Sequence, residues 1–280
     1  MEYFKHDNEI EITGPIDFDP AKIFECGQCF RWEPDNSGVY TGVVGNRVAR
    51  IRSSGESIFI SCSLEDFETF WHGYFDLEHD YAEIRSRLSL DSFMRDAVEY
   101  GKGIRILHQD NWEALCSFII SQCNNIPRIK KIISALCYEF GEKLEFFGED
   151  FYSFPSAAVI AALSPDDLSH IRCGYRAPYI INAAKAVATG DINLDALAQG
   201  TIEAARVALM KLQGVGSKVA DCVLLFGFHM LDAFPLDVWM KRAVAEHFSP
   251  GFDPVVFSPY AGLAQQYIFF YTRSVSMKQK

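Results

Sequence analysis

A lysine and an aspartate with a short glycine-rich turn beside them are the residues of this chain that suggest chemistry. Lys218 lies just after the turn Gly214-Val215-Gly216, and Asp237 follows nineteen residues later. A neutral primary amine is a nucleophile, and a carboxylate stabilises a nearby cation. The first turn of a helix disfavours positive charge, so a lysine placed there has more of its neutral form. The pair predicts an amine nucleophile assisted by a carboxylate.

The turn before Lys218 is suited to holding an anion. Gly214 and Gly216 have no Cβ, so they can take positive φ and let another backbone approach. We expect Ser217 to be the N-cap of the next helix, whose free N–H groups and dipole favour a phosphate of DNA. A tight helical corner without a ligand is the alternative, and Asp237 has the alternative role of a helix cap.

The residues after 110 repeat their apolar side chains at helical spacing, which would position Lys218 and Asp237 on helices. A helix–hairpin–helix is expected at about 201–230. The predicted helices are Trp112–Cys123, Arg128–Phe140, Ser156–Leu163, Pro165–Ile171, Ala177–Thr189, Thr201–Leu212, Ser217–Met230, Asp237–Phe248 and Pro259–Arg273.

The first hundred residues have the composition of short strands separated by turns. Strands are expected within Glu9–Phe18, Cys29–Glu33 and Val39–Cys62, followed by helices at Ser63–Phe75 and Leu88–Tyr100. The sequence therefore predicts an α+β protein. An antiparallel sheet domain with a few helices spans 1–105, and an all-α domain spans 106–280.

The net charge of −11 does not exclude DNA, because the acidic residues are concentrated in one part of the chain. Residues 1–113 contain 11 Lys+Arg and 22 Asp+Glu, and the remaining residues contain 15 of each. Residues 204–220 contain three basic residues and no acidic ones. If such stretches converge, they form a local positive face; otherwise they are ordinary solvated side chains.

The eight cysteines are expected to be reduced and mostly buried, because no secretion signal precedes them. Cys26 and Cys29 form a CxxC, which alone is a weak zinc or redox signal. We expect no metal ion and no cofactor. No run of eighteen apolar residues is present. An intracellular location is expected, in the cytoplasm at the nucleoid of a bacterium or in the nucleus of a eukaryote.

Several segments together resemble the 8-oxoguanine DNA glycosylase family of the helix–hairpin–helix glycosylase superfamily, and the resemblance covers nearly the whole chain. The segments that carry it are Gly27-Gln28-Cys29-Phe30-Arg31-Trp32, Phe118–Arg128, Cys173-Gly174-Tyr175-Arg176-Ala177-Pro178-Tyr179, Leu212–Cys222, Phe234-Pro235-Leu236-Asp237-Val238 and Gly262-Leu263-Ala264-Gln265. The resemblance implies a monomer that acts on double-stranded DNA containing oxidised guanine.

The same resemblance implies a role for each matching residue. Lys218 would form a Schiff base with the sugar of a flipped-out nucleotide, and Asp237 would stabilise the sugar cation. The Gly27 carbonyl would accept a hydrogen bond from N7–H of the lesion. Cys222 and Phe269 would sandwich the base, and Gln265 would bind its Watson–Crick edge. The orphan cytosine and the duplex would be contacted by Asn124, Asn125, Arg128, Tyr175 and Arg176. Gly214, Val215 and Gly216 would form the phosphate-binding hairpin.

Two positions depart from the family pattern. Cys123 stands where the family often has the first of three asparagines, and Trp239 stands where some members have histidine. Three other functions remain as alternatives: an alkylated-base glycosylase, a non-catalytic DNA-binding module and a lysine-dependent aldolase or decarboxylase. The alkylated-base enzymes typically lack the lysine, so Lys218 discriminates against them.

Overall fold

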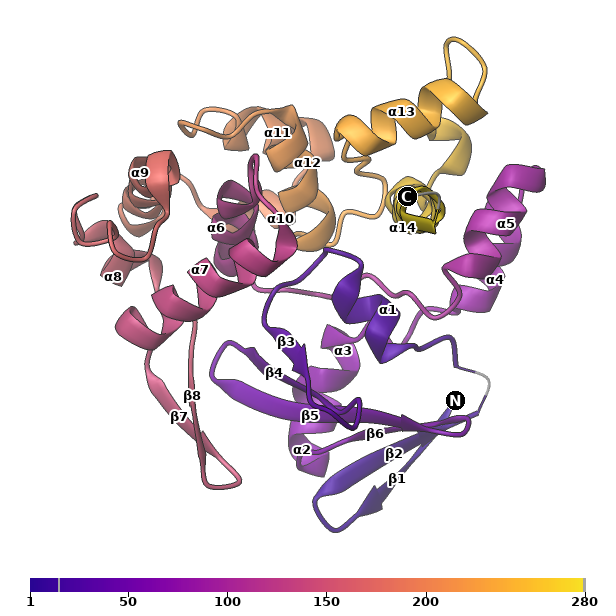
Figure 1. Cartoon of the computed structure of the whole chain (residues 1–280), viewed down its shortest axis with the longest axis horizontal. Coiled ribbons are helices and arrows are strands. Elements are labelled where there is room, and N and C mark those ends of the chain that lie inside the picture. The colour runs from indigo at the N-terminus through magenta and orange to yellow at the C-terminus, as the bar shows by residue number, and fades with distance from the viewer. Residues whose placement is uncertain (15, 279–280) are drawn as a thin grey trace.

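The computed structural model describes residues 1–14 and 16–278, apart from the side chains of 276–278. Its N-terminal part is a six-stranded antiparallel sheet with strand order β1-β2-β6-β5-β4-β3 (Figure 1). The strands are β1 (Glu2–His6), β2 (Glu9–Thr13), β3 (Trp32–Pro34), β4 (Tyr40–Val44), β5 (Arg47–Ser54) and β6 (Ser57–Ile60).

Alternation of apolar residues determines which face of the sheet is buried. Ile10 of β2 is the register partner of Ile60 of β6, and both side chains are fully buried. Phe67 and Trp71 belong to the same buried cluster. They lie on a continuous helical segment made of α2 (Leu64–Asp66), the π-helical turn η1 (Phe67–Trp71) and α3 (His72–Tyr74), which covers this face. Side chains therefore pack between one helix and one side of the sheet.

The remaining elements are mostly helices, and they surround a second core (Figure 1). The helices are α1 (Pro20–Glu25), α4 (Tyr81–Leu88), α5 (Ser92–Tyr100), α6 (Asn111–Ser121), α7 (Ile126–Phe140), α8 (Ala157–Ala161), α9 (Ala177–Ala188), α10 (Leu194–Ala198), α11 (Ile202–Leu209), α12 (Ser217–Phe226), α13 (Val238–His247) and α14 (Ala261–Lys278), with 3-10 turns η2 (Gly174–Arg176) and η3 (Pro254–Phe257). The expected α+β class, with a sheet followed by helices, is confirmed.

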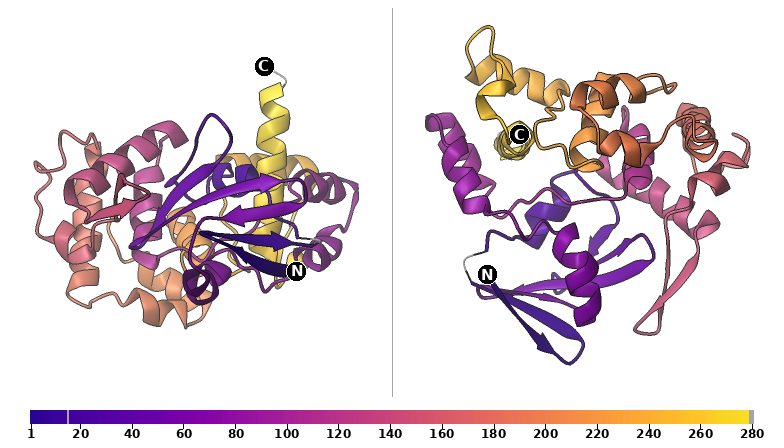
Figure 2. Two further views of the ribbon diagram at one scale, coloured as in Figure 1. Left: turned by 90° about the horizontal axis from the view of Figure 1, so that it is seen from below. Right: turned by 180° about the vertical axis from the view of Figure 1, so that it is seen from behind.

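The second core includes residues from the first hundred. Tyr81 and Ile84 of α4 and Met94 of α5 are buried in it, and α5 packs against α14 (Figure 2). The two cores therefore interleave along the sequence, because Leu107 belongs to the sheet core whereas Cys26 and Phe30 belong to the second core. The expected domain boundary at residue 105 stays a prediction.

Several local features of the structure differ from the expectations. The helix expected at Pro165–Ile171 is wrong: Ser164 donates from its backbone N–H and its hydroxyl to Asp167, which favours turns over a helix. An unpredicted hairpin joins β7 (Lys143–Phe146) to β8 (Glu149–Tyr152). Helix α1 was also not predicted, although Asp19 caps it and Pro20 starts it. Within the described residues, no helix is both long and apolar enough to cross a membrane.

Candidate active site

The hairpin between α11 and α12 requires glycine at position 214. Gly214 has φ +84°, and a Cβ there would overlap the ring of Tyr179. Val215, in the middle of the turn, is buried and anchors it in the core, and its N–H bonds the Leu212 carbonyl at 3.0 Å. Gly214 is therefore required by conformation and by contact, as the sequence predicts.

Helix α12 begins without a side-chain cap. Its N-cap is Gly216, in extended conformation, and Ser217 is the first helical residue, so the expectation that Ser217 caps the helix is wrong. A Cβ at Gly216 would meet nothing within 4 Å. The first N–H groups of a helix have no partner inside the helix. Here they lie at an exposed turn, at the positive end of the helix dipole, which favours an anion.

Lys218 is the second residue of α12 and its side chain is half-buried. Its Nζ lies 5.5 Å from the ring centroid of Phe118 on α6, within the range of a cation–π contact. α12 packs against α6 along this side. The amine is therefore held at the edge of the core by an aromatic ring.

Asp237 is the N-cap of α13, and its Oδ1 accepts from the Met240 N–H at 2.8 Å. The side chain is half-buried, and the preceding Pro235 is buried. The cap fixes the carboxylate with respect to α13. The expected capping role of Asp237 is confirmed, and it leaves the second carboxylate oxygen available for another contact.

The charges of Lys218 and Asp237 both act on Cys222, which lies one turn after Lys218 on α12. Burial raises the pKa of the Cys222 thiol to about 11; the positive charge of Lys218 opposes this shift, and the negative charges of Asp221 and Asp237 add to it. Cys222 is 3% exposed. The amine and the carboxylate therefore both lie within electrostatic range of one buried thiol.

The residues expected to hold the lesion base come from two separate segments. Gln265 is buried on α14, and Phe269 lies one turn further along the same helix, half-buried, with the Arg273 guanidinium 5.9 Å from its ring centroid. Gly27 follows α1 and has φ +89°. Burial raises the pKa of the Cys26 thiol to about 11, and the positive charge of Arg273 opposes this shift. α14 therefore lies within electrostatic range of the loop that contains Gly27.

Gln28 fixes the loop that presents Gly27, a role that sequence reasoning missed. Its side chain is fully buried and donates to the carbonyls of Ile23 (3.0 Å) and Arg105 (2.8 Å). The amide oxygen of Gln28, Oε1, accepts a hydrogen bond from the Leu107 N–H at 3.0 Å. The available signal was the polar Gln28 within the mostly apolar segment 27–32. These bonds hold the Gly27 backbone in place.

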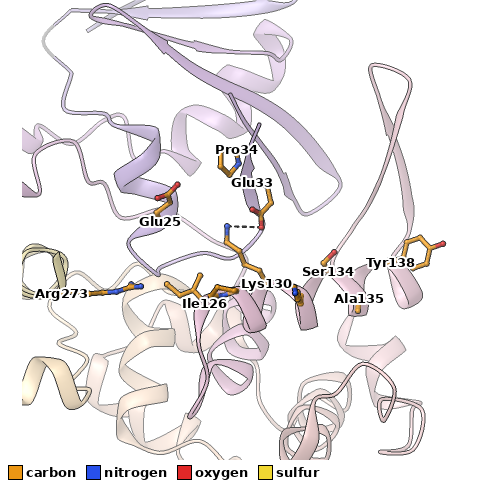
Figure 3. A pocket seen from close by; sticks show the side chains of 11 residues that line it. Glu25, Glu33, Pro34, Ile126, Lys130, Ser134, Ala135, Tyr138 and Arg273 are labelled. Atoms are coloured by element: carbon orange, nitrogen blue, oxygen red, sulfur yellow. Dashed lines mark ion pairs between the residues drawn. The ribbon is translucent and has the colours of Figure 1, made fainter. Parts of the chain in front are cut away.

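A cavity of about 880 Å³ opens near Gly27, between the sheet and α7 (Figure 3). A Cβ at Gly27 would lie 3.8 Å from Ile126, which lines this cavity. Charges of both signs surround it, with Lys130 paired to Glu33 at 3.1 Å. Lys218, Asp237 and Gln265 are not among its lining residues. The cavity therefore does not enclose the amine and the carboxylate.

The residues expected to contact the opposite base gather around one loop, between α6 and α7. Tyr175 donates its hydroxyl to the Gln122 carbonyl at 3.2 Å, and Asn125 caps α7 by accepting from the Arg128 N–H at 3.0 Å. Asn124 donates to the Ile120 carbonyl at 3.1 Å. Tyr175 and Arg128 are exposed. The structure therefore brings these sequence-distant residues together on one surface.

Arg176 differs from Arg128 in being 3% exposed. Its Nε donates to the Gln122 carbonyl at 3.0 Å and its Nη2 to the Cys123 carbonyl at 3.2 Å. The guanidinium also lies over the Tyr175 ring, 4.5 Å from its centroid. In this conformation Arg176 holds the loop and does not face solvent.

Two family models match this chain almost end to end. The N-terminal domain of 8-oxoguanine DNA glycosylase matches residues 12–115, and the HhH-GPD superfamily of base excision DNA repair proteins matches 116–253. The structure described as MBOgg1 with a low-affinity DNA ligand is 40% identical with a TM-score of 0.93, covering 99% of this chain and 100% of that one. The chain belongs to the 8-oxoguanine DNA glycosylase family.

Two further family members are similar over most of this chain. The 8-oxoguanine glycosylase/lyase of Clostridium acetobutylicum, solved with double-stranded DNA containing cytosine opposite 8-oxoguanine, is 34% identical with a TM-score of 0.92, and 99% of each chain is covered. The N-glycosylase/DNA lyase of Saccharomyces cerevisiae is 33% identical over 248 residues. That match covers 79% of this chain and 66% of the yeast protein.

Cys123, the first of the two positions expected to depart from the family pattern, has a strained backbone. Cys123 has φ +48°, a conformation that asparagine adopts more readily than other non-glycine residues. Its side chain is exposed, next to Asn124. Trp239, the second departure, is 40% exposed, and the Arg242 guanidinium lies 5.8 Å from its ring centroid. Both departures lie outside the Lys218–Asp237 pair.

Proposed function

We propose that this chain excises 8-oxoguanine from DNA and nicks the abasic strand, as a bifunctional glycosylase and lyase of base excision repair. The observation that carries the proposal is the presence of Lys218 and Asp237 within electrostatic range of the buried Cys222 in a member of this family. The Clostridium relative is described as an 8-oxoguanine glycosylase/lyase, and the yeast relative as an N-glycosylase/DNA lyase.

The chemistry begins when the neutral Lys218 amine attacks C1′ of the flipped-out nucleotide. The C1′–N9 bond breaks, and the base leaves with the bonding electron pair and takes a proton. Asp237 stabilises the positive charge that develops on the sugar during this step. Opening of the sugar ring gives an iminium, which acidifies the C2′ protons. Loss of one C2′ proton then expels the 3′ phosphate and nicks the strand. Extrusion is required because C1′ is inaccessible to the amine while the base is stacked.

Recognition of the lesion follows from one proton. The oxidised base has N7–H, which donates to the Gly27 carbonyl, whereas normal guanine presents an N7 lone pair that repels it. An opposed buried polar group costs about 1–3 kcal/mol, enough for useful discrimination. Cys222 and Phe269 sandwich the base, and Gln265 bonds its Watson–Crick edge. The turn of Gly214, Val215 and Gly216 holds a backbone phosphate.

The opposite strand is contacted by the loop between α6 and α7. Arg128 and Tyr175 are exposed there, so they contact the orphan cytosine and the gap in the duplex directly. Asn124 and Asn125 shape the loop. Arg176 reaches the base only after releasing the Gln122 and Cys123 carbonyls. With a cysteine at 123, the gap beside the cytosine is filled less completely than by asparagine.

The competing function is that of an alkylated-base glycosylase, which would use Asp237 to activate water. Lys218 argues against it, because that mechanism has no use for an amine held at 5.5 Å from Phe118 beside the carboxylate. The two functions differ in whether a covalent intermediate forms, and this difference can be measured.

The test is reduction by borohydride in the presence of duplex DNA containing 8-oxoguanine opposite cytosine. Wild-type protein should give a covalent adduct that electrophoresis detects, and Lys218→Ala should give none. Lys143→Ala is the matched control, because Lys143 is an exposed lysine on β7, outside the hairpin and the α6–α7 loop, and this variant should leave trapping intact. Base excision by the wild type without any trapped adduct would instead support the alkylated-base mechanism.

The proposal also places the protein where its substrate is. A repair enzyme that acts on genomic DNA is intracellular, at the nucleoid of a bacterium or in the nucleus of a eukaryote. We infer a monomer, because one chain supplies the amine, the carboxylate and both base-contacting surfaces. Sedimentation of the protein with one lesion duplex tests this stoichiometry.

A further inference from the structure

One aspartate and three histidines cluster at the end of α12 opposite to Lys218. His229 Nε2 lies 3.6 Å from Asp76 Oδ2, and His108 Nε2 lies 3.4 Å from Asp76 Oδ1. One ligand atom from each of these three residues lies within 4.8 Å of the other two. His79 Nδ1 lies 2.6 Å from Asp76 Oδ1 on the outer side. The proposed repair chemistry uses none of these residues.

Asp76 is buried and held in a fixed orientation. It is 4% exposed, and the Tyr81 hydroxyl donates to its Oδ2 at 2.7 Å. A carboxylate has about four lone-pair sites, so the bonds from Tyr81 and His79 leave acceptor capacity directed at His108 and His229.

The backbone is strained at two members of the cluster. Asp76 has φ +52° and His229 has φ +53°, although neither is glycine. His229 comes just after the C-cap of α12, and the next residue, Met230, closes the helix end with a 2.8 Å bond to the Leu224 carbonyl. Strain of this kind persists where surrounding structure holds it, and it is concentrated at functional sites.

The donor set and spacing fit a transition-metal ion. Zinc binds imidazole nitrogen and carboxylate oxygen at about 2.0–2.2 Å, so neighbouring ligands of a tetrahedral ion lie roughly 3.4 Å apart. His108 Nε2 lies 3.4 Å from Asp76 Oδ1 and His229 Nε2 lies 3.6 Å from Asp76 Oδ2, so each imidazole is near that spacing from one oxygen of the carboxylate. The side chain of His108 is 45% exposed, which gives an ion access and leaves room for water ligands.

The His108 and His229 rings must move apart slightly to bind an ion. They are stacked, with centroids 3.5 Å apart and planes inclined by 20°, so their lone pairs do not yet converge on one point. The exposed His108 ring can turn about its χ2 angle, which has a broad energy well. His229 Nε2, now 3.2 Å from the Ile106 carbonyl, would exchange this contact for the ion, and the ring proton would then lie on Nδ1.

We propose that Asp76, His108 and His229 form a binding site for a divalent transition-metal ion, with Zn²⁺ as the representative. The ion would take one carboxylate oxygen and two imidazole nitrogens, with water completing its coordination, while His79 and Tyr81 orient Asp76. The site joins three segments: the end of α3, the connection before α6 and the C-terminal end of α12. It revises the expectation of no metal, which rested on sequence spacing alone. The proposal is independent of the repair chemistry.

Binding is tested with the untagged full chain in a Cys123→Ser background, because an exposed thiol would itself take up zinc. Competition with a chromophoric chelator at neutral pH measures the affinity and stoichiometry, and Co²⁺ reports coordination through its visible absorption. We expect one equivalent bound. His108→Gln should weaken binding at least tenfold, and Asp76→Asn and His229→Asn should weaken it further.

His170→Gln is the matched control, because His170 is another histidine paired with a carboxylate, Glu139, away from the cluster. It should bind Zn²⁺ like the parent protein. His108→Gln replaces a half-exposed side chain and should fold normally, which circular dichroism checks. Zn²⁺ should raise the melting temperature of the parent but not of His108→Gln. The proposal is overturned if no ion binds at one equivalent, or if His108→Gln and Asp76→Asn bind Zn²⁺ as tightly as His170→Gln.

Discussion

The first turns of α12 and α13 carry the two residues of the proposed chemistry, and they are built in opposite ways. α12 begins at Gly216 with no side-chain cap, and Lys218 is its second residue. α13 begins at Asp237, whose carboxylate caps its own helix through Met240. One helix start is left open to an external anion, and the other is closed by the proposed catalytic carboxylate itself.

This difference shows how one local motif can serve two purposes. The unpaired N–H groups of a helix start attract negative charge in both cases. At α13 the chain supplies that charge, which fixes the position of Asp237 near Cys222. At α12 the chain supplies none, and the proposed ligand is a phosphate of DNA. Substitutions that interchange the two arrangements test the comparison.

The largest effect is expected when Asp237 loses its charge and keeps its cap. Asparagine caps helices as well as aspartate does, so Asp237→Asn should fold and bind lesion DNA normally. Excision should slow by about 10²–10⁴, the usual contribution of a positioned acid–base or charge-stabilising group. Single-turnover kinetics measure this. Asp110→Asn, at the cap of α6, is the control and should retain full activity. Unchanged turnover in Asp237→Asn would leave Asp237 with a structural role only.

The next effect concerns stability at the hairpin. Gly214→Ala introduces a Cβ into the Tyr179 ring and forces a non-glycine residue to φ +84°. We expect a loss of about 2–4 kcal/mol in unfolding free energy, from strain and steric overlap combined. Gly216→Ala should change stability little, because open space surrounds that position. Urea denaturation of both variants provides the measurement, and equal losses would contradict the packing described here.

A smaller effect is expected when α12 is given the kind of start that α13 has. Gly216→Asp adds a capping carboxylate and should raise stability by a few tenths of a kcal/mol. The same carboxylate would occupy the phosphate position, so DNA binding should weaken by about tenfold. Gly216→Ser, which caps without charge, separates the two contributions. DNA binding by Gly216→Asp at wild-type strength would show that no phosphate is held there.

The smallest effect is a change in salt dependence. Binding of the wild type should weaken steeply as salt increases, because phosphate contacts release counterions. Lys211→Ala should reduce the slope of log K against log salt by about one, if Lys211 contacts one phosphate beside the hairpin. Fluorescence anisotropy at several salt concentrations measures it. A flat response in the wild type would contradict the phosphate role of the hairpin.

The fold class could be predicted because its signals are local. Helical spacing located α12, and alternation located the sheet, whose Ile10 and Ile60 face the same core. The β7–β8 hairpin was not predicted because its turn consists of Phe147 and Gly148, both at positive φ. Asparagine before the glycine would have been the usual signal of such a turn. The helix expected at 165–171 failed because side-chain bonds to Asp167 stabilise turns instead.

The site was predictable only where its residues lie close in sequence. Lys218 and Cys222 are one helical turn apart, so their shared face follows from the period. Nothing in the sequence places Phe118 beside the Lys218 amine, or Tyr179 against Gly214, because both contacts depend on how separate helices pack. The cluster at Asp76 was hidden for the same reason, since its members come from three distant segments.

The packing of α14 against α5 has a consequence for protein synthesis. Gln265 and Phe269, the proposed floor and wall for the base, lie on α14, whereas Lys218 and Asp237 come earlier in the chain. A nascent polypeptide still lacking residues 261–278 would already have the proposed nucleophile but not the residues proposed to hold the base, and the face of α5 that packs against α14 would be uncovered. Synthesis and docking of α14 would therefore complete the proposed site.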